Sequence, residues 1–247
     1  MGKKLKFILY FIIQYLTNKL GKYNKKLPYI LISGIALAIV IYGIKFFIKL
    51  TKSLQTDYLK AFDTQVTDYV ASYRSPALTN FFITITDVGD VWGYLVVFSL
   101  ATFLLYYFFR KWRYVVKLVF VLIIAISSNL LLKQLINRAR PTAAHLVTVK
   151  TLSYPSGHAM TAMAFYGFLI YLLFTFRMNK VIKYSLITCF AFLIFSIGVS
   201  RIYLGVHYPS DVIGGFIAGF IWVIFCILLL NLFKIFRNYS KIERFVK

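Results

Sequence analysis

The sequence predicts an all-α integral membrane protein: a bundle of six transmembrane helices with an extracytoplasmic amphipathic helical segment. Its 247 residues are 60% hydrophobic and 19% aromatic, and only 15% are charged. A soluble domain is about half apolar and about a quarter charged. The apolar residues also gather into six runs, each near the roughly 20 residues that a helix needs to cross a bilayer. The runs are 28–48, 89–109, 114–136, 158–177, 182–200 and 212–233.

Basic residues orient the six spans. The regions 1–27, 110–117, 177–183 and 234–247 hold 19 of the 29 Lys and Arg residues, and six crossings place them on one side of the membrane. Because basic loops stay in the cytoplasm, both termini are expected there, in a multi-pass protein of the plasma membrane. The membrane thus accounts for the net charge of +22, and no nucleic-acid partner is expected. The predicted domains are a basic N-terminal segment (1–27), a six-span domain (28–233) and a basic tail (234–247).

Two segments outside the spans are helical by pattern. Residues 7–16 are apolar but too short to span, and an interfacial helix is preferred to a signal peptide because no small-residue cleavage site follows. Residues 54–73 are too polar to span, but apolar residues recur at helical spacing. This helix is expected on the outer side, either packed on the bundle or forming a lid or wall beside a lipid entrance. Its apolar stripe is Leu59, Phe62, Val66, Tyr69 and Tyr73.

Three polar clusters interrupt the apolar pattern. They are KQLINRARP (133–141), YPSGHAM (154–160) and SRIYLGVHYPSD (200–211), and all three fall at outer ends of predicted spans. Charged residues at the edge of a membrane span are costly, so they indicate function by default. Segments far apart in the sequence are therefore expected to form one site at the extracytoplasmic face.

The cations of these clusters suit a phosphate group. Lys133, Arg140 and Arg201 supply three positive charges, and arginine presents a planar fork that matches phosphate oxygens. Lys133 and Arg140 are seven residues apart, which predicts that they share one helix face. Ser156 and Gly157 precede the fourth span, where free N–H groups and the helix dipole attract anions.

Two histidines supply the candidate reactive groups. Asp211 lies four residues after His207 and can accept from one ring nitrogen, which leaves the other nitrogen free to attack phosphorus. Pro209 is predicted to open the sixth span, so that a second helix N-terminus points at the same phosphate. His158 would protonate the leaving oxygen. Because His207 must be neutral and His158 protonated, a bell-shaped pH profile is expected.

These residues resemble the type-2 phosphatidic acid phosphatase family, whose three-part motif is K-x6-R-P, P-S-G-H and S-R-x5-H-x3-D. Every motif position matches in order. A looser similarity links residues 62–90 to bacterial phosphatidylglycerophosphatase B-like members. The matching residues are Lys133, Arg140, Pro141, Pro155, Ser156, Gly157, His158, Ser200, Arg201, His207 and Asp211.

The resemblance implies a lipid phosphate phosphatase without metal or cofactor, acting through a phosphohistidine on His207. His158 would be the acid and Asp211 the partner of His207. The substrates in view are undecaprenyl pyrophosphate, phosphatidylglycerol phosphate and phosphatidic acid. The alternatives are a lipid phosphotransferase with the same site and a non-catalytic transporter or scaffold, which the intact motif disfavours. The phosphate would be held by Lys133, Arg140, Ser156, Gly157 and Arg201.

Two residues near the motif lie outside it. Arg138 is expected to contact either a lipid headgroup or a second phosphate. His145 is expected to be a solvated loop residue.

Overall fold

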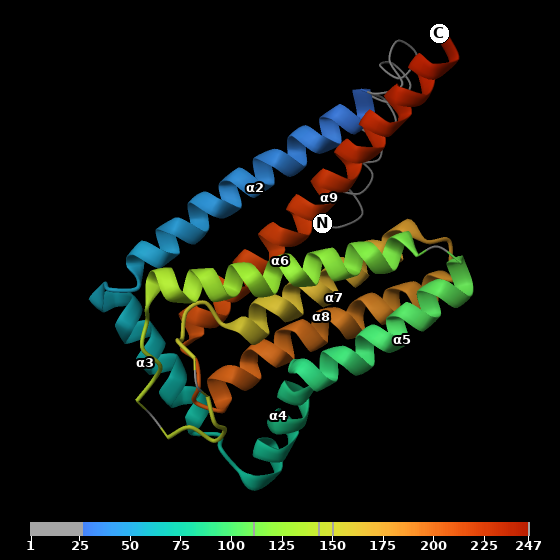
Figure 1. Ribbon diagram of the computed structural model, residues 1–247. Helices are drawn as coiled ribbons and strands as arrows, with labels where there is room; N and C mark the ends of the chain where they lie inside the picture. The colour runs from blue at the N-terminus through green and yellow to red at the C-terminus, as the bar shows by residue number, and fades with distance from the viewer. Residues whose placement is uncertain (1–26, 111, 143, 150, 247) are drawn as a thin grey trace, which may run out of the picture. The chain divides into compact units, whose positions relative to one another are not determined.

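The computed structural model describes residues 27–246 except 111, 143 and 150, and in this part of the chain every regular element is an α-helix (Figure 1). The all-α fold class is confirmed. The interfacial helix predicted over 7–16 lies outside the described residues.

Five described helices are long and apolar enough to cross a membrane. They coincide with five of the six predicted spans, and the remaining predicted run, 89–109, corresponds to the second member of a bent helix pair. The last helix continues beyond the predicted end of its span at 233. The five are α2 (Leu27–Ser53), α6 (Arg113–Ile136), α7 (Gly157–Thr175), α8 (Lys180–Tyr203) and α9 (Pro209–Val246).

The remaining span is a bent pair of helices, α4 (Pro76–Val88) and α5 (Val91–Phe109). The two meet at an angle of 56°, and together they qualify as a sixth crossing. The break has a local cause, because Asp90 caps α5 by accepting a 2.7 Å hydrogen bond from the Val91 N–H. The predicted run 89–109 corresponds to α5 alone, so the described residues hold five candidate spans, or six if the bent pair is counted as one.

One compact unit, Gly43–Val223, contains every predicted site residue, and the chain on either side of it forms a second unit. Within the first unit, α5, α6, α7 and α8 run side by side (Figure 1). The α7 helix is the most buried of them, whereas α6 and α8 expose apolar side chains such as Ile123 and Phe192. Such exposure on long apolar helices is expected where the surrounding solvent is lipid.

The start of α9 packs closely on the start of α7. A methyl group added at Gly215 would stand 2.7 Å from the Ser156 carbonyl oxygen, and one at Gly219 would stand 2.5 Å from the Met160 carbonyl oxygen. Small residues let helix backbones approach in this way inside membrane proteins. The contact draws the His207 turn and the PSGH segment together.

Residues 54–73 contain the predicted amphipathic helix, α3 (Asp57–Ala71), and it does pack on the bundle. The face that packs differs from the expected one. Asp63 and Thr67 are the buried residues, whereas Tyr69 and Tyr73 of the predicted stripe are 64% and 55% exposed. The aromatic stripe does not hold α3, because a buried carboxylate with strong polar partners determines the orientation of this helix.

The described parts of the α6–α7 loop and the α8–α9 turn lie at the same end of the unit as α3 (Figure 1). Backbone hydrogen bonds fix them to one another: the Leu146 N–H donates to the Leu204 carbonyl at 3.0 Å, and the Ser153 N–H donates to the Arg138 carbonyl at 2.9 Å. All three polar clusters of the sequence therefore meet at one end of the helices.

Candidate active site

Lys133 lies in the last turn of α6 and is buried. Its ammonium group donates to the main-chain carbonyls of Leu152 and Ser153. The helix ends at Ile136, because Asn137 adopts a left-handed conformation with φ of 50°. Arg140 consequently lies in the loop, and the prediction that it shares a helix face with Lys133 is wrong. The loop nevertheless returns Arg140 to the site.

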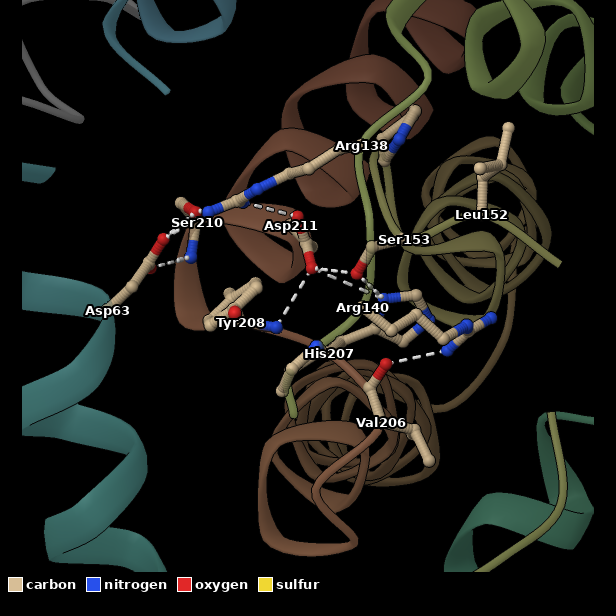
Figure 2. A network of polar contacts seen from close by, with 12 residues as sticks. Asp63, Arg138, Arg140, Leu152, Ser153, Val206, His207, Tyr208, Ser210 and Asp211 are labelled. Atoms are coloured by element: carbon tan, nitrogen blue, oxygen red, sulfur yellow. Dashed lines mark hydrogen bonds and ion pairs between the residues drawn. The ribbon is translucent and has the colours of Figure 1, made fainter. Parts of the chain in front are cut away.

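Arg140 is held beside His207 by three polar groups. Its Nε donates to the Thr151 carbonyl at 2.5 Å, and its NH2 donates to the Thr151 hydroxyl at 3.0 Å. Its NH1 donates to the Val206 carbonyl at 2.6 Å and lies 3.3 Å from His207 Nε2 (Figure 2). A guanidinium can only donate hydrogen bonds. The contact therefore requires that Nε2 carries a lone pair and that the proton of neutral His207 is on Nδ1.

The Nδ1 side of His207 faces Asp211, as the sequence predicted. Nδ1 lies 3.5 Å from Asp211 Oδ2 and 3.4 Å from the Ser153 hydroxyl oxygen. The same Oδ2 accepts a 2.5 Å hydrogen bond from the Ser153 hydroxyl and a 2.8 Å bond from the Tyr208 N–H. His207 and Asp211 are 2% and 0% exposed, so this arrangement is screened from water.

Burial lowers the pKa of His207 to about 3, and the positive charges of Arg140 and Arg201 contribute to that shift. Asp211 raises the pKa of His207, but by less than burial lowers it. His207 is therefore neutral near pH 7, the state in which an imidazole nitrogen can act as a nucleophile. Burial likewise lowers the pKa of Arg140, and the Asp211 carboxylate opposes that change.

The PSGH segment forms the start of α7. The Ser156 N–H donates to the Asp211 carbonyl at 3.0 Å, and the first backbone bond of the helix runs from the Met160 N–H to the Ser156 carbonyl. The N–H groups that lie between Ser156 and Met160, starting with that of Gly157, therefore have no acceptor within the helix, as at any helix start. His158 stands in this first turn and interacts electrostatically with His207 and with the nearby cations.

Arg201 is buried in the last turn of α8, and its NH1 donates to the Thr86 hydroxyl of α4 at 2.7 Å. Its Nε has no hydrogen-bond partner among the described residues, and neither does the buried hydroxyl of Ser156. Buried polar atoms are almost always paired, so two unpaired groups in the predicted phosphate site require an explanation. Both groups are hydrogen-bond donors, and phosphate oxygens are acceptors of the kind that they lack.

The comparisons with known proteins identify the family of the chain. The chain is 30% identical over 206 residues to phosphatidylglycerophosphatase B of Bacillus subtilis (strain 168), a match that spans 81% of this chain and 94% of that protein. The family model described as the PAP2 superfamily matches residues 114–234. The chain belongs to the PAP2 superfamily.

Two solved structures are similar to the structure of this chain. The crystal structure of the transmembrane PAP2 type phosphatidylglycerolphosphate phosphatase from Bacillus subtilis superposes with a TM-score of 0.69 at 26% identity, covering 76% of this chain and 93% of that one. The structure of Aquifex aeolicus LpxE gives a TM-score of 0.54 at 24% identity, covering 66% of this chain and 93% of that one. The latter similarity concerns the fold alone.

The PAP2 match contains every predicted site residue, but it does not contain Asp63, which sequence reasoning missed. This carboxylate reaches the site from α3, where it accepts from the Ser210 N–H at 2.9 Å, from the Ser210 hydroxyl at 2.5 Å and from Arg138 at 2.7 Å. At the second predicted helix N-terminus, that of α9, the Ser210 N–H is thus taken by a side-chain carboxylate and is not available to a phosphate. Pro209 does begin α9, as predicted.

Arg138 lies between two carboxylates of the protein. Its NH1 lies 2.6 Å from Asp211 Oδ1 and its NH2 lies 2.7 Å from Asp63 Oδ2. Burial lowers the pKa of Arg138, but the two carboxylates more than compensate and raise it above its ordinary value. Both ends of the guanidinium are therefore engaged by protein carboxylates.

Ser153 was also missed, because a lone serine in a loop carries no sequence signal. His145 is an exposed loop residue, as expected, with Nε2 2.8 Å from the Pro141 carbonyl oxygen. In the part of the chain that the structure describes, no three His, Cys, Asp or Glu residues are arranged to hold a metal ion.

Proposed function

We propose that the protein is a membrane lipid phosphate phosphatase that transfers the phosphoryl group first to His207 and then to water. The observation that carries the proposal is the orientation of His207. Its Nδ1 faces Asp211 and Ser153, while its Nε2 lone pair faces Arg140. The Nε2 atom of a neutral imidazole thus points toward the Arg140 guanidinium, beside which a phosphate would bind.

The first chemical step forms a bond between His207 Nε2 and phosphorus and breaks the bond from phosphorus to the leaving oxygen. His158, in its protonated form, gives its proton to that oxygen. The Nδ1 proton stays between His207 and Asp211, whose charge stabilises the cationic phosphohistidine. Water then attacks the phosphorus of the phosphohistidine, and His158 accepts the proton of that water. The bond between phosphorus and Nε2 breaks, which releases inorganic phosphate and returns His207 to its neutral form.

The cations stabilise the charge that develops on the transferred group. Phosphoryl transfer depends mainly on positioning and on neutralising the phosphate oxygens. Arg140 and Arg201 approach from the loop and from α8, Lys133 from α6, and the unpaired Ser156 hydroxyl from the start of α7. Gly157 would let the phosphate approach the α7 backbone. These groups can perform the reaction as a protein-only site, so metal independence is part of the proposal.

The substrate class is a lipid phosphate or pyrophosphate presented at the outer leaflet. Phosphatidylglycerol phosphate is favoured by the similarity to phosphatidylglycerophosphatase B, and undecaprenyl pyrophosphate and phosphatidic acid carry the same reacting group. The outer location rests on the basic regions, which would place both termini in the cytoplasm of a plasma-membrane protein. Residues 28–233 would form the phosphatase domain, between a basic N-terminal segment and a basic tail.

The test is phosphate release in detergent containing EDTA, by the wild type and by His207→Ala, from each of the three lipids. Release by the wild type alone is expected, together with acid-labile labelling of His207. Equal release by His207→Ala would contradict the assignment of the nucleophile. Release that requires an added acceptor lipid would favour a phosphotransferase, and no turnover under any condition would favour a non-catalytic protein.

A further inference from the structure

Asp63 is a buried carboxylate to which the proposed reaction assigns no role. It is 1% exposed, and it comes from α3, outside the segment that matches the PAP2 family. Its two oxygens accept three hydrogen bonds, two from Ser210 and one from Arg138 (Figure 2). A buried charge is costly unless it is paired in this way. The pairing therefore fixes α3 to the first turn of α9.

Arg138 connects this carboxylate to the reactive pair. One end of its guanidinium binds Asp63 Oδ2 at 2.7 Å and the other binds Asp211 Oδ1 at 2.6 Å. The guanidinium also stacks on the Tyr208 ring, with its central carbon 4.4 Å from the ring centroid. A planar fork held at both ends and on one face has little freedom to move.

The second oxygen of Asp211 is the one that faces the histidine. Because Arg138 holds Oδ1, Oδ2 is left to face His207 Nδ1, the Ser153 hydroxyl and the Tyr208 N–H. Asp63 also shares the single positive charge of Arg138 with Asp211. Without the Asp63 charge, Arg138 would keep Asp211, the Ser210 hydroxyl and the Tyr208 ring on one side but would lose the partner of its NH2 end.

We propose that Asp63 is a positioning residue: by anchoring Arg138 and the first turn of α9, it fixes the Asp211 carboxylate on the Nδ1 side of His207 and keeps Nε2 unprotonated. Its effect on turnover rests on the proposed function. Its effect on the histidine tautomer does not.

The activity test compares Asp63→Asn with Asp68→Asn. Asp68 is an exposed residue of the same helix, so it is a matched control for loss of one acidic charge. Asp63→Asn is expected to lower kcat by roughly tenfold or more with KM changed less than about twofold, since a loosened Asp211 affects the chemical step and not lipid binding. Asp68→Asn is expected to match the wild type. Wild-type kcat in Asp63→Asn would overturn the proposal.

The second test observes His207 directly. The chain has three histidines, so ¹⁵N-histidine NMR gives few ring signals, and His207→Ala assigns the one of interest. In the wild type and in Asp68→Asn we expect a single tautomer with the proton on Nδ1. In Asp63→Asn we expect a mixture of Nδ1–H and Nε2–H forms. An unchanged tautomer, even with a lower melting temperature or a raised KM, would show that Asp63 only supports the fold and would overturn the proposal.

Arg138→Lys provides a second route if Asp63→Asn does not fold. Lysine keeps the charge but cannot hold two carboxylates with a planar fork, so the same fall in kcat and the same tautomer mixture are expected. A wild-type tautomer in Arg138→Lys would count against the proposal. Absence of phosphate release by the wild type would refute the proposed function, while the tautomer measurement would still decide the role of Asp63.

Discussion

The Ser153 hydroxyl donates a 2.5 Å hydrogen bond to Asp211 Oδ2 and so holds the oxygen that faces His207. Ser153 is also 3.4 Å from His207 Nδ1, and it is fully buried. The partner of the histidine is therefore fixed by a loop residue that lies outside the three-part motif.

Ser153→Ala is expected to lower kcat by about tenfold and to leave KM nearly unchanged, because one hydrogen bond to a charged group contributes roughly 1.5–3 kcal/mol. Steady-state phosphate release from detergent-solubilised lipid measures both constants. Ser72→Ala, at an exposed position on the same unit, is the control and is expected to behave as the wild type. A rise in KM with unchanged kcat would assign Ser153 to substrate binding instead.

Thr86→Val is expected to lower kcat/KM by roughly tenfold. The Thr86 hydroxyl is the acceptor for Arg201 NH1, and its loss leaves a buried cation free to turn away from the phosphate. Thr84→Val, at an exposed position two residues away on α4, is the matched control. If Thr86→Val keeps full kcat/KM, then Arg201 does not depend on α4 for its position.

The burial of His207 makes stability depend on pH with a definite sign. Its pKa falls from 6.5 in the unfolded chain to about 3 in the folded protein, so the unfolded state binds the proton more readily. The contribution of this group is fully present above about pH 6.5 and is lost progressively as the pH falls toward about 3. Thermal unfolding in detergent at about pH 7 and about pH 4 is expected to show a smaller fall in melting temperature for His207→Gln than for the wild type. His145→Gln changes an exposed histidine and is expected to show the same fall in melting temperature as the wild type. An equal fall in all three proteins would show that His207 is not the origin of the acid sensitivity.

Gly215→Ala is expected to lower the melting temperature by several degrees and to reduce activity. The added methyl group would stand 2.7 Å from the Ser156 carbonyl oxygen and 2.9 Å from Ala159 Cβ, and the backbone of α7 cannot yield without moving the phosphate site. Gly34→Ala is the control, because its methyl group would meet no atom within 4 Å. Normal stability of Gly215→Ala would mean that α7 and α9 can separate at no cost.

The positions of the helices could be predicted from the sequence because a bilayer requires long apolar segments, and composition alone records them. The motif spacing likewise placed His207 beside Asp211, since four residues across the start of α9 bring the two together. The sequence did not reveal that Arg140 lies in a loop. Its distance of seven residues from Lys133 suggested a continuing helix, but Asn137 in the left-handed region ends α6.

The sequence by itself determined the membrane fold, the family and the residues that carry charge or an imidazole nitrogen. Only the tertiary structure decided which groups hold those residues in place. Asp63, Thr86 and Ser153 belong to segments far from their partners in sequence, and each contact is a single polar pair with no periodic pattern. The α3 stripe suggested that a neighbouring face packs on the bundle, because periodicity records where apolar residues lie. Periodicity does not record the cost of burying the Asp63 carboxylate without a cation. That cost is larger than the gain from burying the tyrosines of the stripe, so it determines which face of α3 packs.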